Sequence, residues 1–196
     1  MVTTTRLTLD EFLELPETEP PSEYIDGEVI QKVAPSWYHA SLVHYLDRAL
    51  GNYFVEHPGE ARGGPELRHA MRNPGKRSFL PDISVVRVSK IPRDRETRMR
   101  GPVWTPPDFA IEVLSPGDYP GRVLDRADFY MRIGTELLWL VDPELETVTV
   151  YRPSQAPSVH RAPDVIDARP VLSRFELDLR QLFAVLHEHE HDEAPD

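Results

Sequence analysis

The chain of 196 residues contains no cysteine and carries a formal net charge of −11. The lack of cysteine excludes disulfides, a thiolate nucleophile and Cys-ligated zinc, and the acidic balance argues against bulk nonspecific affinity for DNA, which needs clustered lysine and arginine. Because no apolar run approaches the roughly 20 residues of a membrane span and the N-terminus lacks the apolar core of a secretion signal, we expect a cytoplasmic protein without membrane contact.

The first part of the chain predicts a short helix, a β-hairpin and a long helix. Thr8 and Glu11 have the spacing of a capping box, so a short helix should begin there and end before the prolines that follow. The Asp26-Gly27 dipeptide predicts a hairpin turn, because both residues tolerate positive φ. From Ser36, the expected N-cap, to about His57, apolar residues recur at helical spacing and predict the longest helix.

Strand-like runs dominate the second half of the chain. They cover residues 66–71, 82–88, 109–114, 137–141 and 147–151. A helix over residues 122–133, closed by Gly134, separates the third run from the fourth. These two runs and their helix form a β-α-β unit, whose strands should be parallel.

The remaining segments carry weaker patterns. Residues 153–170 contain several prolines and little periodicity, so we expect an irregular connection, and residues 175–186 should end the fold as a short helix. The predicted fold class is α/β (an α+β mixed sheet), a central mixed sheet with helices on its faces and an N-terminal β-hairpin. We expect a single domain over residues 1–186 and a disordered, acidic and histidine-rich tail over residues 187–196.

Two acidic residues occupy unusual places in these runs. Glu112 lies in a stretch that is otherwise apolar, where an ionised carboxylate costs several kcal/mol unless it is paired or metal-bound. Asp82 begins another mostly apolar run directly after Pro81. Two acids at neighbouring strand ends could hold Mg²⁺, which takes one or two carboxylates plus waters and phosphate oxygens. The alternatives are a strand-starting role for Asp82 and a buried Glu–Arg ion pair for Glu112.

The sequence also resembles the Uma2 family, a bacterial branch of the PD-(D/E)xK nuclease superfamily. Each matching motif is weak alone, but together they occur in family order and at family-like spacing from about residue 8 to residue 186. The matching stretches are Glu23–Glu28, Pro35–His39, Pro81–Val86, Ile111–Pro116, Phe129–Gly134 and Leu138–Pro143.

This resemblance implies a restriction-endonuclease-like core and cleavage of nucleic acid that depends on Mg²⁺ or Mn²⁺. Carried over by position, Asp82 is the metal-binding aspartate, Glu112 the second acidic ligand and Glu23 an additional acid. His39 matches a histidine common in the family, which could contact substrate or, equally, cap or pack at the start of a helix. A homodimer is also implied, because two active sites are needed to cut both strands of DNA.

The chain departs from the family pattern at the lysine. The superfamily places a lysine two residues after the second acid, where this chain has Leu114. The Uma2 family commonly carries its lysine on the following helix, four residues before a tyrosine. Here the tyrosine is Tyr130 and the lysine position holds Arg126, with Arg122 where an aspartate is common. Arginine can stabilise charge as lysine does, but it cannot readily release a proton.

Two further features are candidates for binding. The basic strip over residues 87–100 could contact phosphates and Trp104 could stack on a base, or the strip could be a solvated loop. The histidines of the tail could bind metal adventitiously. Our leading hypothesis is a metal-dependent DNA endonuclease with Asp82 and Glu112 as metal ligands. The alternative is a nuclease-like fold without catalysis that binds nucleic acid or protein.

Overall fold

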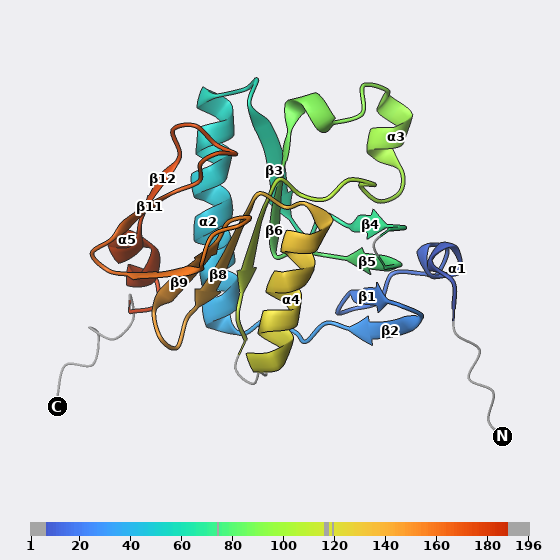
Figure 1. Cartoon of the computed structure of the whole chain (residues 1–196), viewed down its shortest axis with the longest axis horizontal. Helices are drawn as coiled ribbons and strands as arrows, with labels where there is room; N and C mark the ends of the chain where they lie inside the picture. The colour runs from blue at the N-terminus through green and yellow to red at the C-terminus, as the bar shows by residue number, and fades with distance from the viewer. Residues whose placement is uncertain (1–6, 74, 116–117, 119, 188–196) are drawn as a thin grey trace, which may run out of the picture.

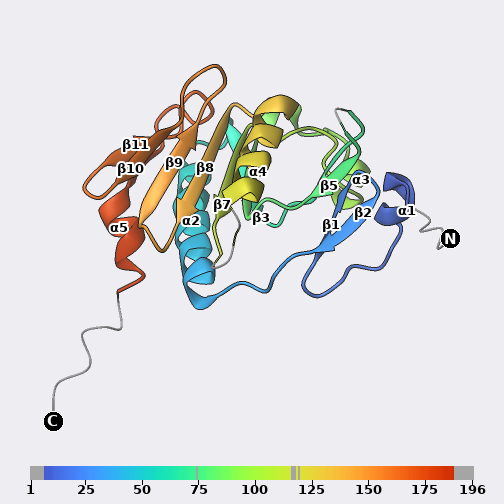
Figure 2. The same cartoon turned by 60° about the horizontal axis from the view of Figure 1, so that its bottom comes forward.

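The computed structural model describes residues 7–187 except residues 74, 116, 117 and 119. Two sheets, one of six strands and one of four, form most of the fold, and a two-stranded sheet is added near the C-terminus (Figure 1). Figure 2 shows the four-stranded sheet beside the six-stranded one, joined to it by the segment that leads from β2 into α2. Within the described ranges no helix is long and apolar enough to span a membrane.

The six-stranded sheet is mixed, as predicted. Its strand order is β10-β9-β8-β7-β6-β3. Only β7 and β8 are parallel, and helix α4 (Pro120–Ile133) connects them, which confirms the predicted β-α-β unit. The strands are β3 (Ala61–Pro65), β6 (Ile83–Arg87), β7 (Phe109–Val113), β8 (Leu137–Asp142), β9 (Thr147–Tyr151) and β10 (Ser158–Arg161).

Helices cover both faces of this sheet (Figure 1). On β7, Phe109 and Ile111 pack with α2 (Trp37–Glu56) and α5 (Leu179–Ala184), whereas Ala110 packs in the cluster that contains α4. Side chains alternate between the two faces of a strand. Glu112 therefore lies on the face that α4 covers.

The four-stranded sheet contains the predicted hairpin. Its order is β2-β1-β5-β4, and the turn between β1 and β2 has positive φ at Asp26 (50°) and Gly27 (100°). Before it lies α1 (Leu9–Leu13), whose capping box between Thr8 and Glu11 is formed as predicted. The strands are β1 (Ser22–Ile25), β2 (Glu28–Gln31), β4 (His69–Met71) and β5 (Arg77–Phe79).

The predicted strand over residues 66–71 is wrong in its extent. The chain instead forms β3 up to Pro65, turns at Glu66 with φ of 50°, and enters β4 in the other sheet at His69. Gly63 lies so close to β6 that an added Cβ would be 2.1 Å from the carbonyl oxygen of Ser84. Glycine is thus required for the pairing of β3 with β6, although its sequence is typical of a loop.

Two expectations near the C-terminus also need correction. Residues 153–170 are not irregular throughout, because they contain β10 and β11 (Val165–Asp167). The final segment begins as β12 (Glu176–Asp178), which pairs with β11, and becomes helical only in α5. Ile166 contributes its side chain to the core. Most of the predicted tail, residues 188–196, lies outside the described residues.

A buried histidine in β4 makes stability depend on pH. His69 is fully buried, with Nδ1 2.8 Å from the carbonyl oxygen of Thr105 and Nε2 3.0 Å from Ser84 Oγ. Since a carbonyl oxygen only accepts, Nδ1 carries the proton and Nε2 accepts from the serine. Burial lowers the pKa of His69 to about 4.

We expect the free energy of unfolding to fall as the pH drops from about 6.5 to about 4. Over this range the unfolded state binds a proton that folded His69 rejects, and the difference in pKa corresponds to about 3 kcal/mol. Urea titrations at several pH values measure the slope of the free energy of unfolding against pH. His69→Asn, whose amide can still donate toward Thr105, should lose this part of the slope, and an unchanged slope would refute the assignment.

Candidate functional site

The register of β6 and β7 brings the two candidate acids together. The strands are antiparallel with Ile83 opposite Ile111, so continuing the register by one residue places Asp82 opposite Glu112. Opposite residues on antiparallel strands have Cβ atoms roughly 4.5–5.5 Å apart. Asp82 Oδ2 also accepts a hydrogen bond from the backbone N–H of Val113 at 2.8 Å. Two acids distant in sequence therefore meet at the end of β7.

Asp82 is buried and held by three donors. Besides Val113, Lys32 Nζ lies 2.9 Å from Oδ1, and His39 Nε2 lies 3.0 Å from Oδ2. Burial alone would raise the pKa of Asp82, but the hydrogen bond from His39 and the charge of Lys32 lower it to about 2. Asp82 is therefore ionised at neutral pH, and His39 donates to it. The His39 side chain thus supports the site. It does not cap the helix that carries it, because the N-cap residue is Ser36.

Glu112 is buried in a different environment. The hydroxyl of Tyr130 donates to its Oε1 at 2.5 Å, and Arg126 NH1 lies 3.3 Å from its Oε2. Burial raises the pKa of Glu112 to about 7, aided by the charge of Asp82 and opposed by that of Arg126. The ion pair with arginine considered from sequence is thus present, in direct contact with the site rather than apart from it.

The cavity next to Glu112 collects the other predicted residues. It has a volume of about 310 Å³, and Glu23, Arg122 and Arg126 line it together with Glu112. Glu23 Oε1 accepts from the backbone N–H of Leu80 at 2.9 Å, which fixes the acid at the wall between the two sheets. All six residues predicted from sequence are therefore in or around one site.

Lys32 is the site residue that the sequence reasoning missed. It follows β2 in the segment that crosses between the sheets (Figure 2), where no periodicity or motif marks it. Burial alone would lower its pKa, but the neighbouring carboxylates, chiefly Asp82 and Glu112, outweigh this effect and raise the pKa above its ordinary value. Lys32 is therefore a charged ammonium group beside both acids.

The side chains at this site fit a hard divalent cation. Among the described residues no group of three or more His, Cys, Asp or Glu is arranged to hold a metal. Mg²⁺, however, commonly uses only one or two carboxylates and completes its shell with waters and substrate oxygens. Asp82 lies opposite Glu112, both supply hard oxygen ligands, and Glu112 lines the cavity. A cation there would compete with Lys32 and Arg126 for these oxygens.

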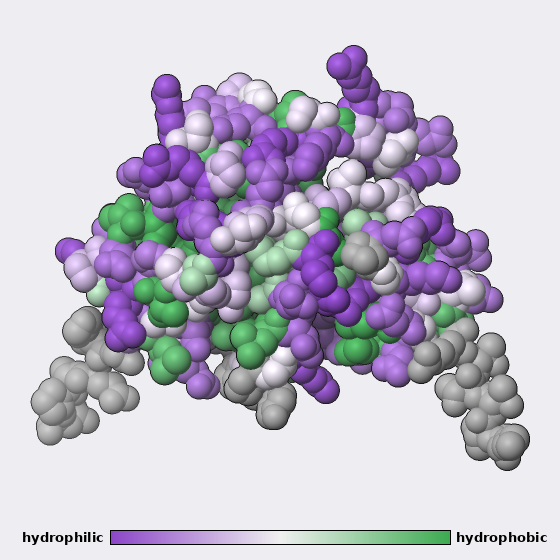
Figure 3. All heavy atoms as spheres, viewed as in Figure 1, coloured by the Kyte–Doolittle hydropathy of each residue, from purple (hydrophilic) through white to green (hydrophobic). Residues whose placement is uncertain are grey.

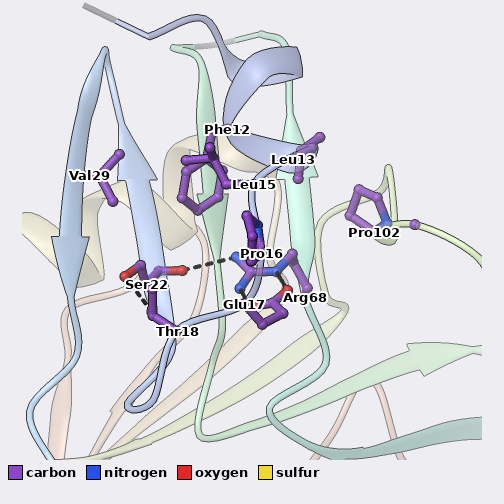
Figure 4. Close-up of a pocket in the computed structure, with 11 residues that line it drawn as sticks. Phe12, Leu13, Leu15, Pro16, Glu17, Thr18, Ser22, Val29, Arg68 and Pro102 are labelled. Carbon is purple, nitrogen blue, oxygen red and sulfur yellow. Dashed lines mark hydrogen bonds and ion pairs between the residues drawn. The ribbon is translucent and has the colours of Figure 1, made fainter.

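A second cavity lies away from both acids (Figure 4). It has a volume of about 390 Å³ and is bordered by α1 and by Arg68. Arg68 donates to both carboxylate oxygens of Glu17, to the carbonyl oxygen of Ser22 and to Ser78 Oγ. These bonds use four of the five N–H groups of Arg68, so most of its hydrogen-bonding capacity serves the fold.

The basic strip is partly neutralised by the protein itself. It contains a 3-10 helix (Val88–Lys90) and α3 (Arg95–Met99). Arg87 and Lys90 both bond to buried Asp108. Their charges are therefore already paired within the protein and are not free for a phosphate. The Trp104 ring is covered on one side by the guanidinium of Arg72, 4.6 Å from its centroid. In Figure 3 the surface around α3, at the upper right, is nevertheless mostly hydrophilic.

The sequence matches the model of the Uma2 family, described as "Putative restriction endonuclease", over residues 9–180. The chain belongs to the Uma2 family. A crystal structure described as a putative nuclease belonging to DUF820, from Anabaena variabilis ATCC 29413, is 36% identical and matches with a TM-score of 0.80 over 92% of this chain and 99% of that chain. No curated protein matches the chain.

These matches confirm two expectations drawn from the sequence. The Uma2 match confirms the family, and the crystal structure confirms a mixed sheet flanked by helices in a nuclease-like fold. This Uma2 protein is therefore nuclease-like in sequence and in structure.

Proposed function

We propose that this Uma2 protein is a divalent-metal-dependent endonuclease that hydrolyses phosphodiester bonds in DNA. The observation that carries the proposal is the pair of buried acids Asp82, directly before β6, and Glu112, opposite it in β7, where Glu112 lines a cavity of about 310 Å³. Nothing in the packing of the sheet requires two buried acids at this position, because a pair of apolar residues would avoid their desolvation cost.

Asp82 and Glu112 would hold Mg²⁺ or Mn²⁺ at this end of the sheet. When bound, such a metal lowers the pKa of a coordinated water and neutralises charge that develops on the phosphate. Glu23 and Arg122 line the same cavity, where Glu23 would assist and Arg122 would bind a phosphate. His39 would keep Asp82 oriented through its hydrogen bond.

The reaction requires one water and no other reactant. The water oxygen bonds to phosphorus as the bond from phosphorus to one sugar oxygen breaks, the water releases a proton to solvent, and the departing oxygen takes one up. Arg126 would stabilise the negative charge on the phosphate oxygens. It cannot act as the base, because a guanidinium keeps its proton throughout the accessible pH range.

A specific observation favours a second function. All four carboxylate oxygens of Asp82 and Glu112 already accept hydrogen bonds, two of them from the cations Lys32 and Arg126. A site that these cations neutralise permanently would not bind a metal. The protein would then be a noncatalytic module that binds nucleic acid or another protein through a nuclease-like fold.

Nicking of supercoiled plasmid DNA separates the two functions. We expect the wild-type protein to nick DNA with Mg²⁺ or Mn²⁺ and not with EDTA. Glu112→Gln should reduce the rate by about 10²–10³-fold, since a ligand charge worth several kcal/mol is lost while the shape is kept. Equal rates in both proteins would indicate a contaminant, and an inactive wild type would favour the noncatalytic module.

The proposal includes a cytoplasmic homodimer, since cutting both strands of a duplex needs two active sites. Sedimentation of the protein alone and with a short duplex measures the association. A protein that stays monomeric in both conditions would contradict this part of the proposal, and only this part.

A further inference from the structure

The Lys32 ammonium group has an unused hydrogen-bond donor at the site. An ammonium group carries three N–H bonds. One is directed to Asp82 Oδ1 at 2.9 Å and another to the carbonyl oxygen of Leu80 at 3.0 Å. In the described part of the chain the third has no protein partner. A charged donor thus remains available beside the two acids.

The position of Lys32 is fixed by the surrounding structure. Its backbone N–H donates to the carbonyl oxygen of Pro21 at 2.9 Å, which ties the residue to the base of the β1–β2 hairpin. Its side chain is 23% exposed, in contrast to most surface lysines. The conformational entropy of a long side chain has therefore been lost in folding, and little more is lost when Lys32 binds an anion.

No other lysine can supply this charge. The chain has lysines only at positions 32, 76 and 90. Lys76 is exposed beside the β1–β2 turn, and Lys90 bonds to Asp108 at 2.6 Å. Arg126, the cation next to Glu112, is directed to that carboxylate.

We propose that Lys32 is a catalytic residue that donates its third N–H to a non-bridging oxygen of the reacting phosphate. An ammonium is a compact point charge that suits a single phosphate oxygen. Its fixed position makes it a preorganised donor where negative charge develops during attack. The inference rests on the proposed nuclease function and adds Lys32 to its machinery. A purely structural role, neutralising Asp82, is the alternative.

Nitrogen NMR tests the contact without requiring cleavage. Protein labelled with ¹⁵N at lysine Nζ should give three side-chain signals, assigned with Lys76→Met and Lys90→Met. A short DNA duplex added with Ca²⁺, as a probe for binding without turnover, should shift the Lys32 signal and leave the Lys76 signal in place. A Lys32 signal that does not move at saturating duplex would overturn the proposal.

Cleavage kinetics test the consequence. Under single turnover with saturating Mn²⁺, Lys32→Met should cleave about 10²-fold or more slowly, the usual cost of losing one preorganised donor. Its affinity for the duplex in Ca²⁺ should change less than about threefold, and Lys76→Met should cleave like wild type. Thermal unfolding checks that each variant folds, and Lys32→Gln replaces the methionine variant if it does not.

The outcomes distinguish this inference from the function on which it depends. Normal cleavage by folded Lys32→Met, with an active wild type, overturns the role of Lys32 and leaves the nuclease intact. A wild type that cleaves no DNA with any divalent metal overturns both.

Discussion

Asp82→Ala is expected to slow DNA cleavage by at least about 10³-fold, which corresponds to about 4 kcal/mol of transition-state stabilisation. The substitution removes a proposed metal ligand. It also releases Lys32 and His39, both of which are held by the Asp82 carboxylate. Several groups thus lose their positions together, so the effect should exceed that of Glu112→Gln. Single-turnover cleavage of a labelled duplex at saturating Mn²⁺ measures the rate.

The matched control is an acid outside the site. Asp128 is exposed on α4 and pairs with Arg132 at 3.0 Å. Asp128→Ala should cleave at the wild-type rate, because surface pairs of this kind contribute little. If Asp82→Ala retained more than about a tenth of the wild-type rate after equal purification, Asp82 would not be a ligand in the reaction.

Asp108→Ala is expected to lower the free energy of unfolding by about 3 kcal/mol. The Asp108 carboxylate is fully buried and accepts from the backbone N–H of Arg87 at 2.8 Å, from the Arg87 guanidinium and from Lys90, both at 2.6 Å. Its removal leaves the backbone N–H of Arg87 without this partner and takes a carboxylate away from two cations, although the guanidinium keeps its bonds to Glu136. We place the cost at the lower end for a buried pair, because Arg87 and Lys90 are partly exposed.

Comparison with Glu136→Ala shows whether the burial of Asp108 causes the loss of stability. Glu136 bonds to the same Arg87 guanidinium but is 35% exposed, so its loss should cost about 1 kcal/mol or less. Urea denaturation measures both variants. Asp108 precedes β7, whereas the site acids lie at the opposite end of that strand, so folded Asp108→Ala should still cleave DNA. Equal losses of stability in the two variants would contradict this explanation.

Local patterns were sufficient to predict several elements of this fold. The helical spacing after Ser36, the turn at Asp26-Gly27 and the β-α-β unit around α4 each depend on neighbouring residues, and all three are confirmed. Strand β3 depends instead on contact with a distant strand. Gly63 permits close approach to Ser84, and a sequence pattern cannot report that contact.

The residues of the site also fall into two groups, those that the sequence pattern marked and one that it did not. Asp82 and Glu112 stood out because acids in apolar strands need compensation, and their meeting follows from the β6–β7 register. Lys32 gave no such signal, because its place beside Asp82 depends on how the link after β2 crosses between two sheets. Two residues of the basic strip show a related effect: Arg87 and Lys90 suggested phosphate binding, but the fold supplies Asp108 as their partner.

Diffraction from a crystal soaked in Mn²⁺ tests the account most directly, because the ion is located by its anomalous scattering. We predict one peak bound to carboxylate oxygens of both Asp82 and Glu112, with Arg126 moved away from Glu112 Oε2 and Lys32 kept in its place beside Asp82. A saturating soak that leaves the Arg126–Glu112 contact in place and gives no peak at the end of β7 would contradict the metal site, and with it the proposed nuclease.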